Sequence, residues 1–186
     1  MGTLFVDKLD PQSGTALEIG SSGDTITVPS GATFNVAGTL QSGGVAVSNT
    51  PAFFVQRSAN QSIATSTLTQ IQFDSETLDT DSAFNLGSHR FTPQVSGYYL
   101  IGMNVRLTSD QDFDQNYIQI NKNSSIVFQS YWENKFYNGH FGQTVIQLNG
   151  STDYVTFYIH QNRGGATDIN ANGTETFAFG HRILGA

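Results

Sequence analysis

Cysteine is absent from the 186-residue chain, and charged residues make up only 12% of it. The absence of cysteine excludes disulfide scaffolds, zinc-finger spacings and thiol chemistry. The charged fraction is well below the roughly 25% of a typical soluble domain, which predicts a neutral, polar surface. The length fits one domain with a real core and leaves room for an appendage.

Basic residues are also few, since 8 Lys and Arg stand against 15 Asp and Glu, a formal net charge of −7. Phosphate contacts need clustered positive charge, so nucleic acid is excluded as an expected partner. No apolar run approaches the roughly 20 residues of a membrane helix, so no membrane insertion is expected. The start of the chain lacks the pattern of an export signal.

Aromatic residues are scarce before Pro51 and dense after it. Only Phe5 and Phe34 precede this position, whereas all 7 tyrosines, the single tryptophan and the remaining phenylalanines follow it. We therefore expect two regions of different structure, residues 1–50 and residues 51–186.

The first region consists of short alternating segments, at 16–20, 24–29 and 33–38, between glycine-rich turns. Alternation between turns predicts short strands. One copy holds too few apolar residues to offset the entropy of ordering, so it is either disordered or completed by neighbours. We expect an attachment region and β-stalk built with identical chains, and a flexible linker is the alternative.

The second region predicts an all-β fold. Its clearest strand is 95–107, where every odd position from Tyr99 to Leu107 is apolar. Further strands are expected at 116–121, 126–130, 143–148, 153–160 and 176–184. Evenly spaced strands with glycine-rich turns, and no capped helical pattern, indicate a sandwich, jelly roll or barrel.

Six residues at fixed offsets carry a family resemblance: Phe73, Asp79, Phe84, Phe91, Gly97 and Tyr99. Their pattern resembles the signature of the globular head of complement component one-q, a trimeric jelly roll related to tumour necrosis factor. Ile101 and Met103 replace its last two aromatics. The resemblance covers about residues 51–186 and implies a homotrimeric jelly-roll head.

The segment before this head resembles a different family. Residues 23–38 are similar to the stalk repeats of bacteriophage fibre proteins, and residues 3–9 resemble the start of short phage virion proteins. The two resemblances together imply a trimeric virion fibre or spike. A capsid decoration protein is the main alternative, and a bacterial surface adhesin is disfavoured by the missing export signal.

An apolar surface opposite the sandwich core is expected to join the copies. Tyr98 and Leu100 on one strand and Tyr158 on another place large side chains there, and such a surface rarely stays in water. These three residues are our predicted trimer interface.

Catalytic patterns are missing, including the nucleophile elbow, the phosphate loop and the His-Glu-x-x-His zinc motif. The acidic residues Asp74, Glu76, Asp79 and Asp81 offer a glycosidase acid pair. Asp79 is already explained by the family signature, so no enzyme is predicted. A polysaccharide-degrading fibre tip is the alternative from the enzyme class.

A loose calcium site is the single cofactor candidate. Asp110, Asp112 and Asp114 alternate as in the opening of a calcium loop. Gln115 and Asn121 stand where an EF-hand needs glycine and glutamate, so an EF-hand is excluded. A solvated loop is the alternative.

The densest aromatic segment, residues 131–137, contains Tyr131, Trp132 and Tyr137. With Arg163 in the turn 162–165 these residues are receptor-binding candidates, because aromatic rings stack on sugars and arginine bonds to hydroxyls. The alternative interpretation is that these aromatic residues serve core packing and contact between subunits. The expected partners are further copies of the chain, other virion proteins through the N-terminal region, and a host surface glycan or protein.

Overall fold

The computed structural model describes residues 14–17, 19–42, 45–108, 115–132 and 139–183. The chain divides into two compact units, Met1–Gln41 and Ser42–Ala186. Before Gln41, every described residue is exposed and none lies in a strand. The described residues of the segments 16–20, 24–29 and 33–38, where strands are predicted, therefore form no strand in the single chain, because their exposed apolar side chains have nothing to pack against.

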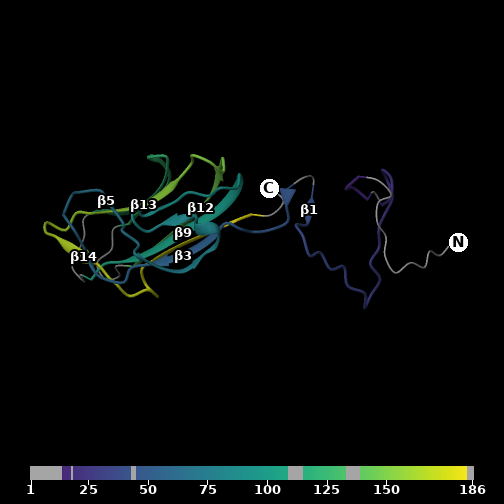
Figure 1. Cartoon of the computed structure of the whole chain (residues 1–186). Coiled ribbons are helices and arrows are strands. Elements are labelled where there is room, and N and C mark those ends of the chain that lie inside the picture. The colour runs from purple at the N-terminus through teal and green to yellow at the C-terminus, as the bar shows by residue number, and fades with distance from the viewer. Residues whose placement is uncertain (1–13, 18, 43–44, 109–114, 133–138, 184–186) are drawn as a thin grey trace. The chain divides into compact units, whose positions relative to one another are not determined.

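The second unit is a sandwich of two antiparallel sheets (Figure 1). The five-stranded sheet has the order β12 (Gly139–Leu148), β9 (Gly97–Arg106), β15 (Phe177–Arg182), β3 (Ala52–Gln56) and β6 (Ser75–Asp79). The six-stranded sheet has the order β11 (Ser125–Trp132), β10 (Asn116–Lys122), β13 (Val155–Gln161), β8 (Arg90–Phe91) and β7 (Phe84–Asn85), and β5 (Thr69–Gln70) also pairs with β13. The fold predicted for the head, an all-β jelly-roll sandwich, is confirmed.

Short elements complete the chain. A 3-10 turn, η1 (Thr80–Ser82), follows β6. Two small sheets pair β14 (Thr167–Ile169) with β4 (Gln61–Ile63), and β1 (Gln41–Ser42) with β2 (Val45–Ala46).

The sandwich has two distinct ends. We call the end at which β3 begins and β15 finishes the proximal end, because the chain enters the sandwich there. The backbone N–H of Arg182 donates to the carbonyls of Asn49 and Pro51 at this end. At the distal end β9 finishes and β12 begins, with Arg106 paired to Gly139. Strand β14, whose neighbour Asn170 bonds to the Arg106 carbonyl, lies at the far left of this unit in Figure 1.

The core between the sheets explains the signature residues. Phe73, Phe84, Phe91 and Tyr99 are all buried, and the Phe91 ring lies 5.6 Å from that of Tyr99. Tyr99 donates a hydrogen bond of 2.6 Å to the Val95 carbonyl, and burial raises its pKa to about 12. The carboxylate of Asp79 accepts the backbone N–H groups of Ala83 and Phe84, which fixes the turn after β6.

Each strand predicted for the head is present with ends shifted by no more than two residues, except that β12 begins four residues before the predicted start at 143. The odd positions from Tyr99 to Leu107 are fully buried, as the alternation predicts. On β13 the residues Val155, Phe157 and Ile159 face the core, and Tyr158 and His160 point away from it.

Candidate functional site

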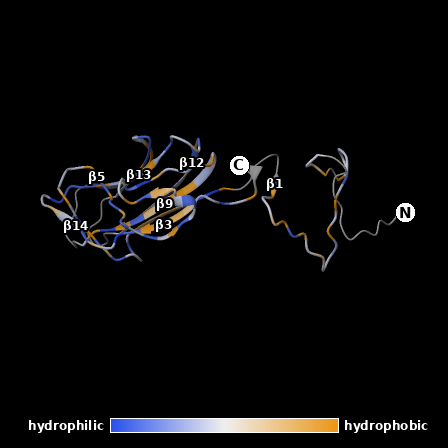
Figure 2. Cartoon of the chain, viewed as in Figure 1, coloured by the Kyte–Doolittle hydropathy of each residue, from blue (hydrophilic) through white to orange (hydrophobic). Residues whose placement is uncertain are grey.

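The outer face of the five-stranded sheet, which points away from the core, carries many large apolar side chains, with polar residues such as Gln143, Gln147 and His181 between them. Its side chains alternate with the core residues, and Figure 2 shows hydrophobic residues on β3, β9 and β12. The large apolar members are Phe54, Leu78, Tyr98, Leu100, Phe141, Val145, Phe177 and Phe179. Phe141 and Val145 are each 53% exposed. We call these eight residues the apolar face.

Four phenylalanines form a continuous band across the apolar face. Phe54 stacks on Phe177 with ring centroids 5.3 Å apart, and Phe179 lies 6.3 Å from both Phe177 and Phe141. A Cβ at Gly102 would come within 2.5 Å of the Phe179 ring. Glycine at this position therefore lets the ring lie flat on the sheet.

The three predicted interface residues do not share a face. Tyr98 and Leu100 belong to the apolar face, on β9. Tyr158 lies on β13, on the outer face of the six-stranded sheet, opposite Gln119 and Gln70. The prediction grouped it with Tyr98 because alternation identifies an outward residue but not the sheet that carries it.

A row of rings crosses the outer face of the six-stranded sheet near the distal end. His160, Tyr117 and Tyr131 sit opposite one another on β13, β10 and β11. The Tyr117 ring lies parallel to His160 at 4.5 Å and 5.0 Å from the ring of Tyr131. We call these three residues the aromatic row. Of these three residues, only Tyr131 is predicted from the sequence as a receptor-binding candidate, because the pairing of β10 with its neighbours is needed to bring in the other two.

Two members of the aromatic row, Tyr117 and His160, have pKa values shifted by burial. Burial lowers the pKa of His160 and raises the pKa of Tyr117, which the nearby Tyr131 raises further. Both shifts favour the neutral forms of these side chains. The row therefore offers ring faces and neutral polar atoms to a ligand.

Of the other receptor candidates, Trp132 is not presented with Tyr131. Trp132 points inward, packs against the core and stacks on His140 of β12. Burial lowers the pKa of His140 to about 3. Arg163 is half-buried in a turn, and its backbone N–H donates a hydrogen bond to Oε1 of Gln161. Tyr137 lies outside the described residues.

Two of the four acidic candidates, Asp74 and Asp79, have structural partners. Asp74 pairs with Arg57 at 2.9 Å, and Asp79 holds the turn after β6. No group of three metal-ligating side chains occurs among the described residues. Asp110, Asp112 and Asp114, the predicted calcium ligands, lie outside that part of the chain.

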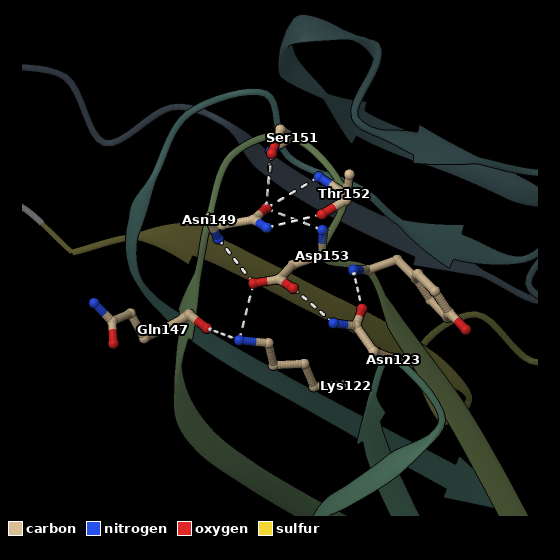
Figure 3. A network of polar contacts seen from close by, with 8 residues as sticks. Lys122, Asn123, Gln147, Asn149, Ser151, Thr152 and Asp153 are labelled. Atoms are coloured by element: carbon tan, nitrogen blue, oxygen red, sulfur yellow. Dashed lines mark hydrogen bonds and ion pairs between the residues drawn. The ribbon is translucent and has the colours of Figure 1, made fainter.

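A polar network fixes turns at the proximal end (Figure 3). Asn149 Oδ1 accepts the backbone N–H groups of residues 151–153. Asp153 accepts hydrogen bonds from Lys122 Nζ at 2.9 Å and Asn123 Nδ2 at 2.6 Å, and Lys122 is the main cause of its lowered pKa. Because these groups satisfy one another, the network holds the fold rather than a ligand.

No helix in the described part of the chain is long and apolar enough to cross a membrane.

Comparison with known proteins gives a consistent result for the sandwich. A family model of the C1q domain matches residues 52–181, more than half of the chain. A search of curated protein sequences finds no match to this chain.

Solved structures with the same fold have low sequence identity. Murine APRIL at pH 8.0 is 14% identical over 71% of this chain and 98% of its own, with a TM-score of 0.57. The globular domain of zebrafish complement 1qA protein is 17% identical over 72% and 97%, with a TM-score of 0.53. The PRD1 vertex protein P5 is 19% identical over 73% and 99%, also with a TM-score of 0.53. These similarities show the fold alone.

Proposed function

The chain belongs to the C1q domain family, and from this premise we propose that it is a structural protein of a bacteriophage particle. In this proposal it forms a homotrimeric fibre or spike, and its head faces outward and adheres to the host surface. The observation that carries the proposal is the apolar face, because a protein that stays monomeric rarely leaves so large an apolar surface in water. Burial of this face between copies would stabilise the trimer.

The N-terminal unit supports association in a second way. Its apolar side chains are exposed in the single chain, including Ile26 at 66% and Phe34 at 69%. Three copies held together by their heads would bring three such segments side by side and give each a surface to pack against. We propose that the segment forms the stalk in this way and attaches to other virion proteins.

The direction of the head follows from its two ends. The N-terminal unit precedes β3 in sequence, and β3 begins at the proximal end. The aromatic row lies near the distal end, where Tyr117 and His160 neighbour the strand termini Asn116 and Gln161. A head joined to the particle at its proximal end presents the row outward. Similarity in fold to a vertex protein supports a virion location.

The trimer can be tested by light scattering and native mass spectrometry of the full chain at micromolar concentration. We expect a threefold oligomer that Phe141→Asp dissociates, because a carboxylate would be buried without a partner. Leu68→Asp is the matched control, since Leu68 is similarly exposed but lies outside the apolar face. A monomeric wild-type chain would contradict the proposal.

The virion assignment has its own test. Mass spectrometry of purified particles should find this chain, and its absence would exclude a virion role. If the chain is present but the purified protein neither binds host cells nor competes with infection, the capsid decoration function replaces host adhesion.

A further inference from the structure

We propose that the outer face of the six-stranded sheet binds an uncharged oligosaccharide, with the Tyr131 ring as the platform on which a sugar stacks. This inference rests on the proposed function, because it names the class of ligand that the outward head would hold. It concerns a different surface from the apolar face.

Tyr131 is placed as a free platform. It lies on β11, the edge strand of its sheet, and it is 59% exposed. It is the last ring of the aromatic row, so Tyr117 neighbours it on β10, and among the described residues no strand pairs with the other side of β11. One ring face is therefore open to a ligand, and the C–H face of a sugar ring is a good partner for an aromatic ring.

The rest of the row holds the platform in position. Tyr117 is half-buried and lies between Tyr131 and the parallel ring of His160, with an angle of 4° between the planes of Tyr117 and His160. A tyrosine has only two rotatable side-chain angles, and packing on a neighbouring ring restricts them further. Little freedom is then left to lose when a ligand binds.

Polar side chains continue the same face toward the proximal end. Gln119 stands opposite Tyr158 and Gln129, and Asn121 stands opposite Thr156. Gln119, Asn121 and Thr156 are each more than nine-tenths buried, yet Gln119 Oε1, Asn121 Oδ1 and Thr156 Oγ1 have no hydrogen-bond partner among the described residues. Buried polar atoms are normally bonded, so these acceptors indicate that a donor is missing.

Sugar hydroxyl groups supply such donors. The amide and hydroxyl side chains of this face carry no formal charge, and the neutral forms of Tyr117 and His160 are favoured. Arg90 of β8 is a cation at the proximal end of this face, where it neighbours Thr156 and lies 5.0 Å from the centre of the Tyr154 ring. Nearer the distal end, the paired positions around Tyr131 and Gln119 on β10, β11 and β13 carry no formally charged side chain. Stacking on one ring together with hydrogen bonds to neutral amides therefore favours an uncharged glycan.

The test uses the full chain and a panel of maltotriose, isomaltotriose, cellotriose and chitotriose, with a heparin tetrasaccharide as the anionic comparison. Saturation-transfer NMR and calorimetry should detect millimolar binding of at least one neutral probe. Millimolar binding at one site still gives firm attachment when the three heads of a trimer, and many trimers on one particle, bind at the same time. Tyr131→Ala should weaken that binding by about tenfold or more, because it removes the stacking surface. Tyr131→Phe should retain most of it.

Tyr154→Ala is the matched control, since Tyr154 lies in the proximal turn, where it contacts Asn123 and Ser124, and its removal leaves Tyr131 in place. The proposal is overturned if no neutral probe binds, if heparin alone binds, or if Tyr131→Ala binds as well as wild type. Light scattering of the same samples separates the two proposals. A trimer without glycan binding contradicts only this inference, and a monomer that binds glycan contradicts only the trimeric assembly.

Discussion

In the N-terminal unit Ile26 and Val28 alternate with threonines, and in the globular unit Ile101 and Met103 alternate with Gly102 and Asn104. The first pair is 66% and 45% exposed, whereas the second pair is fully buried. The same local pattern therefore has different outcomes. A strand forms where a second layer covers its apolar side, as the six-stranded sheet covers β9.

The two units should differ most in the free energy of unfolding that is lost when one phenylalanine is replaced in each. Phe91→Ala leaves a cavity between Phe53 and Tyr99 and should lower the free energy of unfolding by about 3–5 kcal/mol. Phe34→Ala, at a residue that is 69% exposed, should change it by less than about 0.5 kcal/mol. Urea unfolding of the full chain, followed by tryptophan fluorescence, measures both. Equal losses would mean that Phe34 belongs to a folded core.

Acid should destabilise the globular unit through His140. Its pKa is about 3 in the folded chain, against an ordinary value of 6.5. The unfolded chain therefore binds a proton that the folded chain excludes, and stability falls as the pH drops from about 6.5 toward 3. A shift of this size corresponds to several kcal/mol at about 1.4 kcal/mol per unit.

Replacement of His140 tests this linkage. His140→Leu should flatten the dependence of the unfolding free energy on pH in this window, measured by urea titration at pH 7, 5 and 4. His160→Gln should flatten it less, because His160 is only partly buried. An unchanged slope in His140→Leu would contradict the role of its burial.

The two histidines also show how far the sequence predicts this protein. Alternation places His160 on the outer side of its strand, and the structure agrees. His140 lies inside because Gly139–Leu148 extends the predicted strand 143–148 and pairs His140 with buried Val105. Strand ends near turns depend on partners far along the chain, so a local pattern misses them.

The candidate site was predicted less completely than the fold. Tyr131 and Trp132 are adjacent in sequence, but successive residues of a strand point to opposite faces, so only Tyr131 is presented outward. Tyr117 and His160 are 43 residues apart in the chain and are joined by strand pairing. The order of strands in a sheet is a property of the whole fold, and no local motif records it.

A smaller effect is expected at the proximal end, where polar bonds rather than core packing hold the turns. Asp153→Ala removes the ion pair with Lys122 and the bond from Asn123, and should cost about 1–3 kcal/mol. Urea unfolding at pH 7 measures the loss. Ser151→Ala is the control, because the remaining bonds to Asn149 Oδ1 persist without its hydroxyl group. A loss no greater than that of the control would show that Asp153 is dispensable.

Substitutions in the N-terminal unit should have the smallest effect on the free energy of unfolding. Their effect should appear instead in the rate at which a protease cleaves this segment. Ile26→Ser and Val28→Ser together should change the unfolding free energy of the head by less than about 0.5 kcal/mol, because both side chains are exposed in the single chain. If trimerisation packs three segments together, the wild-type segment should be cleaved slowly and the double variant quickly.

A peptide of residues 14–41 should give a disordered circular dichroism spectrum, since one copy cannot cover its own apolar residues. The dissociated Phe141→Asp variant provides the control, because its segment should be cut as fast as that of the double variant. Rapid cleavage of the wild-type segment in an intact trimer would instead make residues 14–41 a flexible linker.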